Sequence, residues 1–257
     1  MIYKSLIIIL LLVFIGVSIP MVDRDGMSYR IISKLVFPMS KQLLPIQKNI
    51  VSGGFESDLT IIPQYWKWFK PELVDYKFTD KGLIVEPTEE SVWWKNKSAV
   101  SLYHHIKGDF DIQVKVLTRK ASNQASYPDQ DYQFGGIILR DPSANAVLGR
   151  ENHVFNVVGY RGGGLQIETK NTTNGYSQVS GFDWSSGDAD LRIHRTGNQF
   201  DMYARLPTSN EWVQVNSFER NDFPDTLEVG LIVYAYSHGK NRYDLTVTFE
   251  HINISQQ

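Results

Sequence analysis

The carboxylate with the most promising setting for chemistry is Glu168, in the segment GLQIETK. Alternate side chains of a β-strand point to opposite faces, so with Leu165 and Ile167 in the core, Gln166, Glu168 and Lys170 would share the other face. Glycoside cleavage needs two carboxyl groups, about 5 Å apart for retention and 6.5–9.5 Å for inversion. Because no second carboxylate stands beside Glu168, it is a catalytic candidate only, and a solvated strand carboxylate is the simpler interpretation.

Several rings and planar polar groups are expected on that same face, which is what a sugar ligand requires. Arg140 ends the apolar segment FGGIILR and would clamp a carboxylate or vicinal hydroxyls, or form a salt bridge to Glu151 or Asp141. The candidate ligand contacts are Trp94, Tyr103, His105, Arg140, Asn156, Glu168 and Tyr236. Taken singly, each ring is explained equally well as cover for the second face of a wide sheet.

Metal chemistry has weaker support in the sequence. The chain has no cysteine, which excludes disulfides and thiolate sites. The adjacent His104 and His105 point to opposite faces of a strand and cannot share an ion. Two groups of loop acids offer the hard oxygen ligands of calcium: Asp129, Asp131 and Asp141, and Asp183, Asp188 and Asp190. Acidic turn residues are common without a metal, so no cofactor is predicted.

The elements that would position these residues are β-strands. In DFDIQVKV, Phe110, Ile112, Val114 and Val116 alternate with polar residues, the pattern of a half-buried antiparallel strand. Similar segments recur at intervals of about a dozen residues, the spacing of a sandwich or barrel. We predict strands at 58–62, 82–86, 91–95, 98–105, 109–118, 132–140, 152–160, 164–170, 175–180, 189–195, 198–205, 211–218, 227–236 and 242–253. The expected inter-sheet core is Phe110, Ile112, Val114, Leu191, Ile193, Leu245, Val247 and Phe249.

The N-terminus has a different composition. Lys4 precedes an apolar run from Leu6 to Val17, so residues 1–22 are predicted to be a signal peptide or a helical membrane anchor at the short end of the spanning range. The positive charge before the run places the rest of the chain outside the cytoplasm, secreted or anchored. Residues 23–53 form a connector with a short amphipathic helix near 29–37, ended by Pro38. Residues 54–257 form one sandwich domain.

Charge narrows the range of partners. The formal net charge is −2 with acids and bases interspersed, and no basic stripe indicates a nucleic-acid partner. Membrane contact is expected only through the N-terminal segment. The aromatic content of 12% favours β structure first and sugar stacking second.

Several segments in this order resemble the concanavalin A-like lectin/glucanase superfamily: QYWKWFKP, GLIVEP, VWWKNKSAVSL, GDFDIQVKV, FGGIILRDP, LEVGLIVYAYS and YDLTVTFEHINI. More narrowly, the order is similar to an uncharacterised bacterial family and to the C-terminal sandwich of β-xylosidases. The resemblance covers about residues 54–254. It implies an all-β jelly roll of two antiparallel sheets with ligands in the groove of the concave sheet.

The resemblance does not extend to a catalytic signature. The E-x-D-x-x-E run of the superfamily's glucanases is absent, and LQIET has Thr169 where sandwich-fold alginate lyases place a histidine. The sequence therefore favours a non-catalytic, glycan-binding, lectin-like protein. The alternatives are a glycosidase or polysaccharide lyase acting in the groove, and a structural envelope protein. The ligand and the oligomeric state are not indicated.

Overall fold

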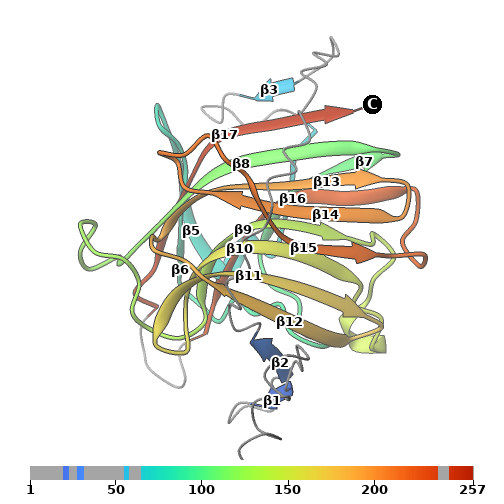
Figure 1. The fold of residues 1–257 in the computed structure, drawn as a ribbon, viewed down its shortest axis with the longest axis horizontal. Helices are drawn as coiled ribbons and strands as arrows, with labels where there is room; N and C mark the ends of the chain where they lie inside the picture. Colours follow the sequence, from blue (N-terminus) through green and yellow to red (C-terminus); the bar gives the residue numbers. More distant parts are fainter. Residues whose placement is uncertain (1–19, 23–27, 32–54, 58–64, 237–242, 257) are drawn as a thin grey trace, which may run out of the picture.

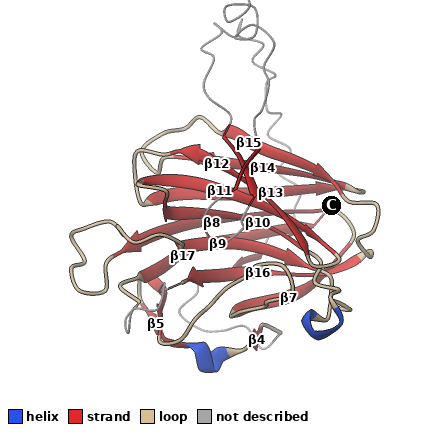
Figure 2. Cartoon of the chain, turned by 90° about the horizontal axis from the view of Figure 1, so that it is seen from below, coloured by secondary structure: helices blue, strands red, loops and turns tan. Residues whose placement is uncertain are grey.

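The computed structural model describes residues 20–22, 28–31, 55–57, 65–236 and 243–256. They form two β-sheets whose long strands run in similar directions (Figure 1). Among these residues, helix is confined to two short 3-10 turns, η1 (Pro71–Leu73) and η2 (Ala146–Leu148), which lie in connections between strands (Figure 2). The prediction of an all-β, two-sheet sandwich is confirmed for this part of the chain.

Sheet A contains, in spatial order, β1 (Pro20–Val22), β2 (Ser28–Ile31), β12 (Tyr176–Asp183), β11 (Gly164–Thr173), β10 (His153–Arg161), β9 (Gln133–Arg140), β16 (Thr226–Ala235), β7 (Ser101–Lys107) and β4 (Lys67–Phe69). Sheet B contains β15 (Val213–Glu219), β14 (Gln199–Arg205), β13 (Asp188–Thr196), β8 (Phe110–Arg119), β17 (Thr246–Gln256), β6 (Gly82–Pro87) and β5 (Val74–Thr79), and β3 (Phe55–Ser57) also pairs with β17. All these pairings are antiparallel except that of β2 with β12, which is parallel. The prediction of purely antiparallel sheets is wrong at that edge.

The main core lies between the sheets and follows directly from the alternation in the sequence. Along β8, Phe110, Ile112, Val114 and Val116 are at most 1% exposed, and they face apolar side chains of sheet A such as Ile137. All eight residues predicted for this core are buried in it. Since apolar burial is worth about 25 cal/mol per Å², this interface is the principal source of stability.

Most predicted strands after residue 80 are present, with ends displaced by a few residues. The exception is 91–95, which forms no strand, only isolated bridges at Ser91 and Trp94. The edge strands β4 and β5 were not predicted, because one is short and the other is largely exposed. The predicted strand at 58–62 and most of the N-terminal segment and connector lie outside the described residues. Where the connector helix was predicted to begin, residues up to Ile31 belong to β2.

Candidate functional site

Residues 88–100, here called the cover segment, lie across the outer face of sheet A, where ligand contacts were expected. Ser91 exchanges backbone hydrogen bonds of 3.0 and 2.8 Å with Ala235, and its hydroxyl donates to the Val233 carbonyl at 2.7 Å. Trp93 and Trp94 are 0% and 9% exposed. Both belong to a second apolar cluster on this face. The two rings therefore cover sheet A together, and Trp94, a predicted ligand contact, is buried there.

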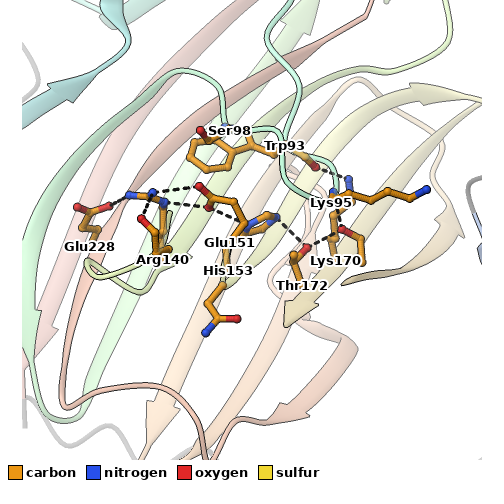
Figure 3. Close-up of polar contacts among 12 residues, drawn as sticks. Trp93, Lys95, Ser98, Arg140, Glu151, His153, Lys170, Thr172 and Glu228 are labelled. Carbon is orange, nitrogen blue, oxygen red and sulfur yellow. Dashed lines mark hydrogen bonds and ion pairs between the residues drawn. The ribbon is translucent and has the colours of Figure 1, made fainter. Parts of the chain in front are cut away.

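Beneath the cover segment, one row of polar side chains crosses six neighbouring strands. From β7 to β12, cross-strand pairing aligns His105, Glu228, Arg140, His153, Thr172 and Ser177. Figure 3 shows two hydrogen-bonded parts of this row, Glu228 with Arg140 and His153 with Thr172. Such a row on the outer face of a sheet would be ordinary in water, but here four of its members are less than 7% exposed.

Arg140 is the central charge of the row. It donates to Glu228 at 2.9 Å and to both oxygens of Glu151 at 3.1 and 3.2 Å, and also to the Ala144 carbonyl at 3.0 Å. The rings of Phe69 and Trp93 lie 4.9 and 5.8 Å from its guanidinium carbon. The salt-bridge alternative is thus the one observed, with Glu151 as predicted and Glu228 in addition. Protein groups thus occupy the guanidinium nitrogens that could bind a carboxylate or vicinal hydroxyls of a ligand (Figure 3).

His153, next in the row, is fully buried. Its Nε2 lies 3.0 Å from the Thr172 hydroxyl, which in turn contacts Ser177 at 2.8 Å. Its Nδ1 has no hydrogen-bond partner among the described residues. Glu151 is 3.9 Å from Nδ1, and both its oxygens already accept from Arg140. Burial, reinforced by the positive charges of Lys170, Arg140 and Arg220, therefore holds the pKa of His153 well below 6.5.

This lowered pKa predicts an acid-dependent loss of stability. The folded state keeps His153 neutral, whereas the unfolded chain takes up a proton near pH 6.5. The contribution is complete above pH 6.5 and falls as the pH drops below it, by up to about 1.4 kcal/mol per pH unit. His153→Gln keeps a hydrogen-bonding group beside Thr172 but does not titrate. Urea unfolding between pH 7.5 and 5 should therefore show a shallower pH dependence for the variant than for the parent, and equal slopes would contradict the assignment.

Lys170 is also fully buried under the cover segment. Its ammonium donates to the Trp93 carbonyl at 2.8 Å and lies 4.5–5.1 Å from the ring centroids of Phe155, Tyr234 and Trp94. Burial lowers its pKa to about 7, while the charge of Glu168, 3.9 Å away, opposes that shift. The three rings favour the cation as well. With a pKa of about 7, Lys170 is partly protonated at neutral pH.

Glu168 is 2% exposed and accepts from Arg161 at 2.9 Å. Its interpretation as a solvated carboxylate is therefore wrong. With Arg161 on one oxygen and Lys170 near the other, the carboxylate has no solvent-facing atom with which to deliver or remove a proton from a ligand. The catalytic hypothesis for Glu168 gains no support from this geometry.

The other candidate ligand residues are divided between the rim and the interior. Tyr103 and His105 form an edge-to-face pair, with centroids 5.4 Å apart, near the β7 edge, and the His105 side chain is 39% exposed. Tyr236 contacts Tyr132. Asn156 lies on the opposite face from the one expected, since it donates to the Tyr203 carbonyl of sheet B at 2.9 Å. Apart from Asn156, the candidates lie on the outer side of sheet A. Trp94, Arg140 and Glu168 are buried there, Tyr103 and Tyr236 are partly covered, and His105 is exposed.

Sequence reasoning missed a groove of about 890 Å³ on the outer face of sheet B. Its floor is a row of alternating charges on β17, β8, β13 and β14, namely Glu250, Lys115, Asp190 and Arg205. Lys115 contacts Glu250 at 2.7 Å, and Arg205 donates to Asp190 at 2.8 Å. These pairs are partly open to solvent, with side chains 15–31% exposed.

An aromatic ring and an unpaired amide complete the groove. The half-buried ring of Trp212 lies 4.5 Å from the Arg205 guanidinium carbon. Asn253 Oδ1 is buried and has no hydrogen-bond partner among the described residues. The groove depends on a bulge in β17 between Glu250 and Asn253, where His251 has φ 51°. At the same place Gly82 approaches the Phe249 carbonyl so closely that a Cβ would lie 2.1 Å from it. The only sequence signal was the polar alternation of these strands, which indicates a solvated face rather than a cavity.

The acids proposed for calcium mostly serve turns and ion pairs. In the second group, Asp188 pairs with Arg119 and Asp190 with Arg205, and the first group is similarly engaged. Asp129 contacts Lys120, Asp131 accepts from the Gly162 amide at 2.7 Å, and Asp141 accepts from Ser143. Within the described ranges, no group of three or more His, Cys, Asp and Glu side chains is placed to hold a metal ion. In the same part of the chain, no helix is long and apolar enough to span a membrane.

Comparisons with known proteins define the class of fold. No protein-family model matches the chain, and no curated protein matches it in sequence. Among solved structures, a functionally unknown protein from Saccharomyces cerevisiae is similar at a TM-score of 0.60 and 17% identity, over 75% of this chain and 97% of that one. A xylan β-1,4-xylosidase from Bacillus halodurans C-125 gives 0.57 and 11%, over 93% of this chain but 46% of that one. Lectin II from Ulex europaeus gives 0.51 and 9%, over 80% and 99%.

These structures share the jelly-roll sandwich, so the resemblance to the concanavalin A-like fold is confirmed. At such low identities the likeness concerns the fold alone. The chain corresponds to less than half the length of the xylosidase.

Proposed function

We propose that this chain is an extracytoplasmic, non-catalytic carbohydrate-binding protein whose ligand lies in the groove of sheet B. The observation that carries the proposal is the groove itself, because its volume of about 890 Å³ falls within the range of small-molecule sites. Trp212 lines the groove and offers a half-buried ring for stacking. The extracytoplasmic location rests on the apolar run that follows Lys4.

The charges of the groove support binding rather than turnover. Asp190 and Glu250 each contact a cation, so neither is placed to protonate a leaving group. Charges that already pair within the protein suit a neutral saccharide. Its hydroxyls can donate to the carboxylates and accept from the lysine and arginine. The carboxylates under the cover segment are likewise paired, and they are buried.

Trp212→Ala is expected to weaken binding of a neutral polysaccharide by about 1–3 kcal/mol, because a stacking contact is lost. Stability should change little, since the ring is half-buried. The measurement is affinity electrophoresis or calorimetry against a panel of neutral glycans. Tyr176→Ala, which removes a 65% exposed ring from β12, is the matched control and should bind normally.

A companion variant distinguishes the two faces. His105→Ala alters the accessible rim of sheet A and leaves the groove intact. If it abolishes binding while Trp212→Ala has no effect, the site lies on sheet A and our placement is wrong. Cleavage of a glycan by the purified chain would favour the enzyme alternative.

The structural envelope role is the second candidate, and the cover segment favours it. Trp93 and Trp94 fill the face on which a ligand groove was expected. If no glycan in a broad panel binds, this role replaces the first proposal.

A further inference from the structure

The connection between β9 and β10 displays two aliphatic side chains to solvent. Val147 and Leu148, in the η2 turn, are 93% and 64% exposed. Val147 is the most exposed large hydrophobic side chain in the described ranges, where the next aliphatic after this pair is Val213 at 53%. Removing apolar side chains of this size from water is favourable, so their display needs an explanation.

The exposure is imposed by a well-ordered backbone. Asn145 Oδ1 accepts from the amides of Val147 and Leu148 at 3.0 and 3.3 Å. Gly149, with φ 66°, donates to the Ala146 carbonyl at 3.1 Å and ends the turn. The buried Arg140 donates to Ala144 at the start of the same connection. The turn therefore holds the two side chains outward instead of letting them fold back onto the sheet.

The surroundings of this turn are aromatic and basic. Asn96 of the cover segment lies against Gly149 and Gly175, which brings Lys95 and the β11–β12 hairpin next to η2. That hairpin carries Tyr176, which is 65% exposed. Lys95 and Arg150 are exposed. An aliphatic tip with a tyrosine and cations around it matches the headgroup region of a bilayer, where apolar groups enter and basic groups meet anionic lipid.

The chain itself indicates a membrane as the occupant. Its apolar N-terminal segment, where it is retained as the predicted anchor, holds the chain at one. The segment that follows this run joins sheet A through β2, which pairs with β12, the strand that begins at Tyr176. We propose that the η2 tip, comprising Val147, Leu148, Tyr176, Lys95 and Arg150, inserts into the headgroup region of an anionic bilayer. This contact adds to the glycan site on sheet B and does not depend on it.

The absence of cysteine allows a direct test in the full chain. Val147→Cys and Leu148→Cys, each labelled with an environment-sensitive fluorophore, are reconstituted into vesicles of phosphatidylcholine with and without phosphatidylglycerol. We expect blue-shifted emission, a several-fold rise in intensity and quenching by spin-labelled lipid, all stronger with phosphatidylglycerol. Val213→Cys on β15 is the matched control and should keep a water-like spectrum. Adding Lys95→Gln and Arg150→Gln should remove the difference between the two lipid mixtures.

Two results would overturn the proposal. One is a water-like spectrum for both tip labels in both kinds of vesicle. The other is a blue shift that appears without lipid and grows with protein concentration, because the occupant would then be a second copy of the chain.

Discussion

Replacing Arg140 with methionine is expected to lower the free energy of unfolding by about 3–5 kcal/mol, the usual cost of removing one partner from a buried ion pair. Glu151 is fully buried and Glu228 is 8% exposed, and both would lose the arginine that neutralises them. The Ala144 carbonyl would lose its donor as well. Methionine has a similar length and still fills the space beside Phe69 and Trp93, so the effect isolates the charge. Chemical denaturation at neutral pH measures it.

Arg205→Met is the matched control for this experiment. Arg205 also pairs with a carboxylate and lies beside a tryptophan, but its side chain is 29% exposed. Partly solvated pairs of this kind contribute about 0–1 kcal/mol, so this variant should unfold nearly as the parent does. Equal losses in the two variants would show that burial is not what makes Arg140 important. Adding Glu151→Gln to Arg140→Met should recover part of the loss, since it removes one of the orphaned charges.

Trp93→Ala is expected to cost about 3–5 kcal/mol, as other large-to-small changes at buried rings do. The ring is fully buried and packs against Phe69 and His153, with centroids 6.1 and 5.3 Å away. Its Nε1 donates to the Val100 carbonyl at 3.2 Å. The alanine variant would leave a cavity above Arg140 and beside Lys170, which the cover segment could close only by giving up its contacts with Val233 and Ala235.

An amine-reactive reagent gives a second measurement on the same variant. In the parent chain Lys170 is fully buried and should react slowly. In Trp93→Ala its reaction rate should increase more than the rate of any other lysine. If Trp93→Ala loses less than about 1 kcal/mol, the loss is far below that of a packed core ring, and the cover segment contributes little to stability. Trp212→Ala, which truncates a half-buried tryptophan elsewhere, provides the comparison.

The sequence predicts the inter-sheet core well because that core depends on local alternation. In β8 and β13, every second residue from Phe110 to Val116 and from Leu191 to Ile193 is apolar, and a one-residue error would reverse the pattern. The cover segment does not follow this rule. SVWW has the composition of a strand, but Lys95 adopts φ 52° and the chain turns back, with Trp94 bridging Lys97. No local pattern distinguishes these alternatives, since the deciding contacts are with distant strands.

The candidate site was predicted only in part for the same reason. Alternation placed Glu168 and Lys170 on the outer face of β11 correctly, but alternation does not indicate whether that face meets water or a covering segment. The assignment of Asn156 failed because its neighbours on β10 are apolar on both faces. The sequence pattern therefore does not indicate which face of the strand its side chain is on. The groove on sheet B was missed because it arises from a bulge in β17 and the approach of Gly82, neither of which the hydrophobic pattern encodes.

The polar row across sheet A also affects how its strands find their alignment during folding. A shift of β9 by one residue would turn Arg140 toward the inter-sheet core and bury its charge without a partner. A shift by two residues would restore its direction but move it away from His153 and Glu228, its cross-strand neighbours. Apolar strands such as FGGIILR would otherwise tolerate several alignments at little cost. The buried charges therefore favour a single register of β9 against its neighbours. Misaligned pairings of these strands should be less stable and should dissociate rather than persist and aggregate.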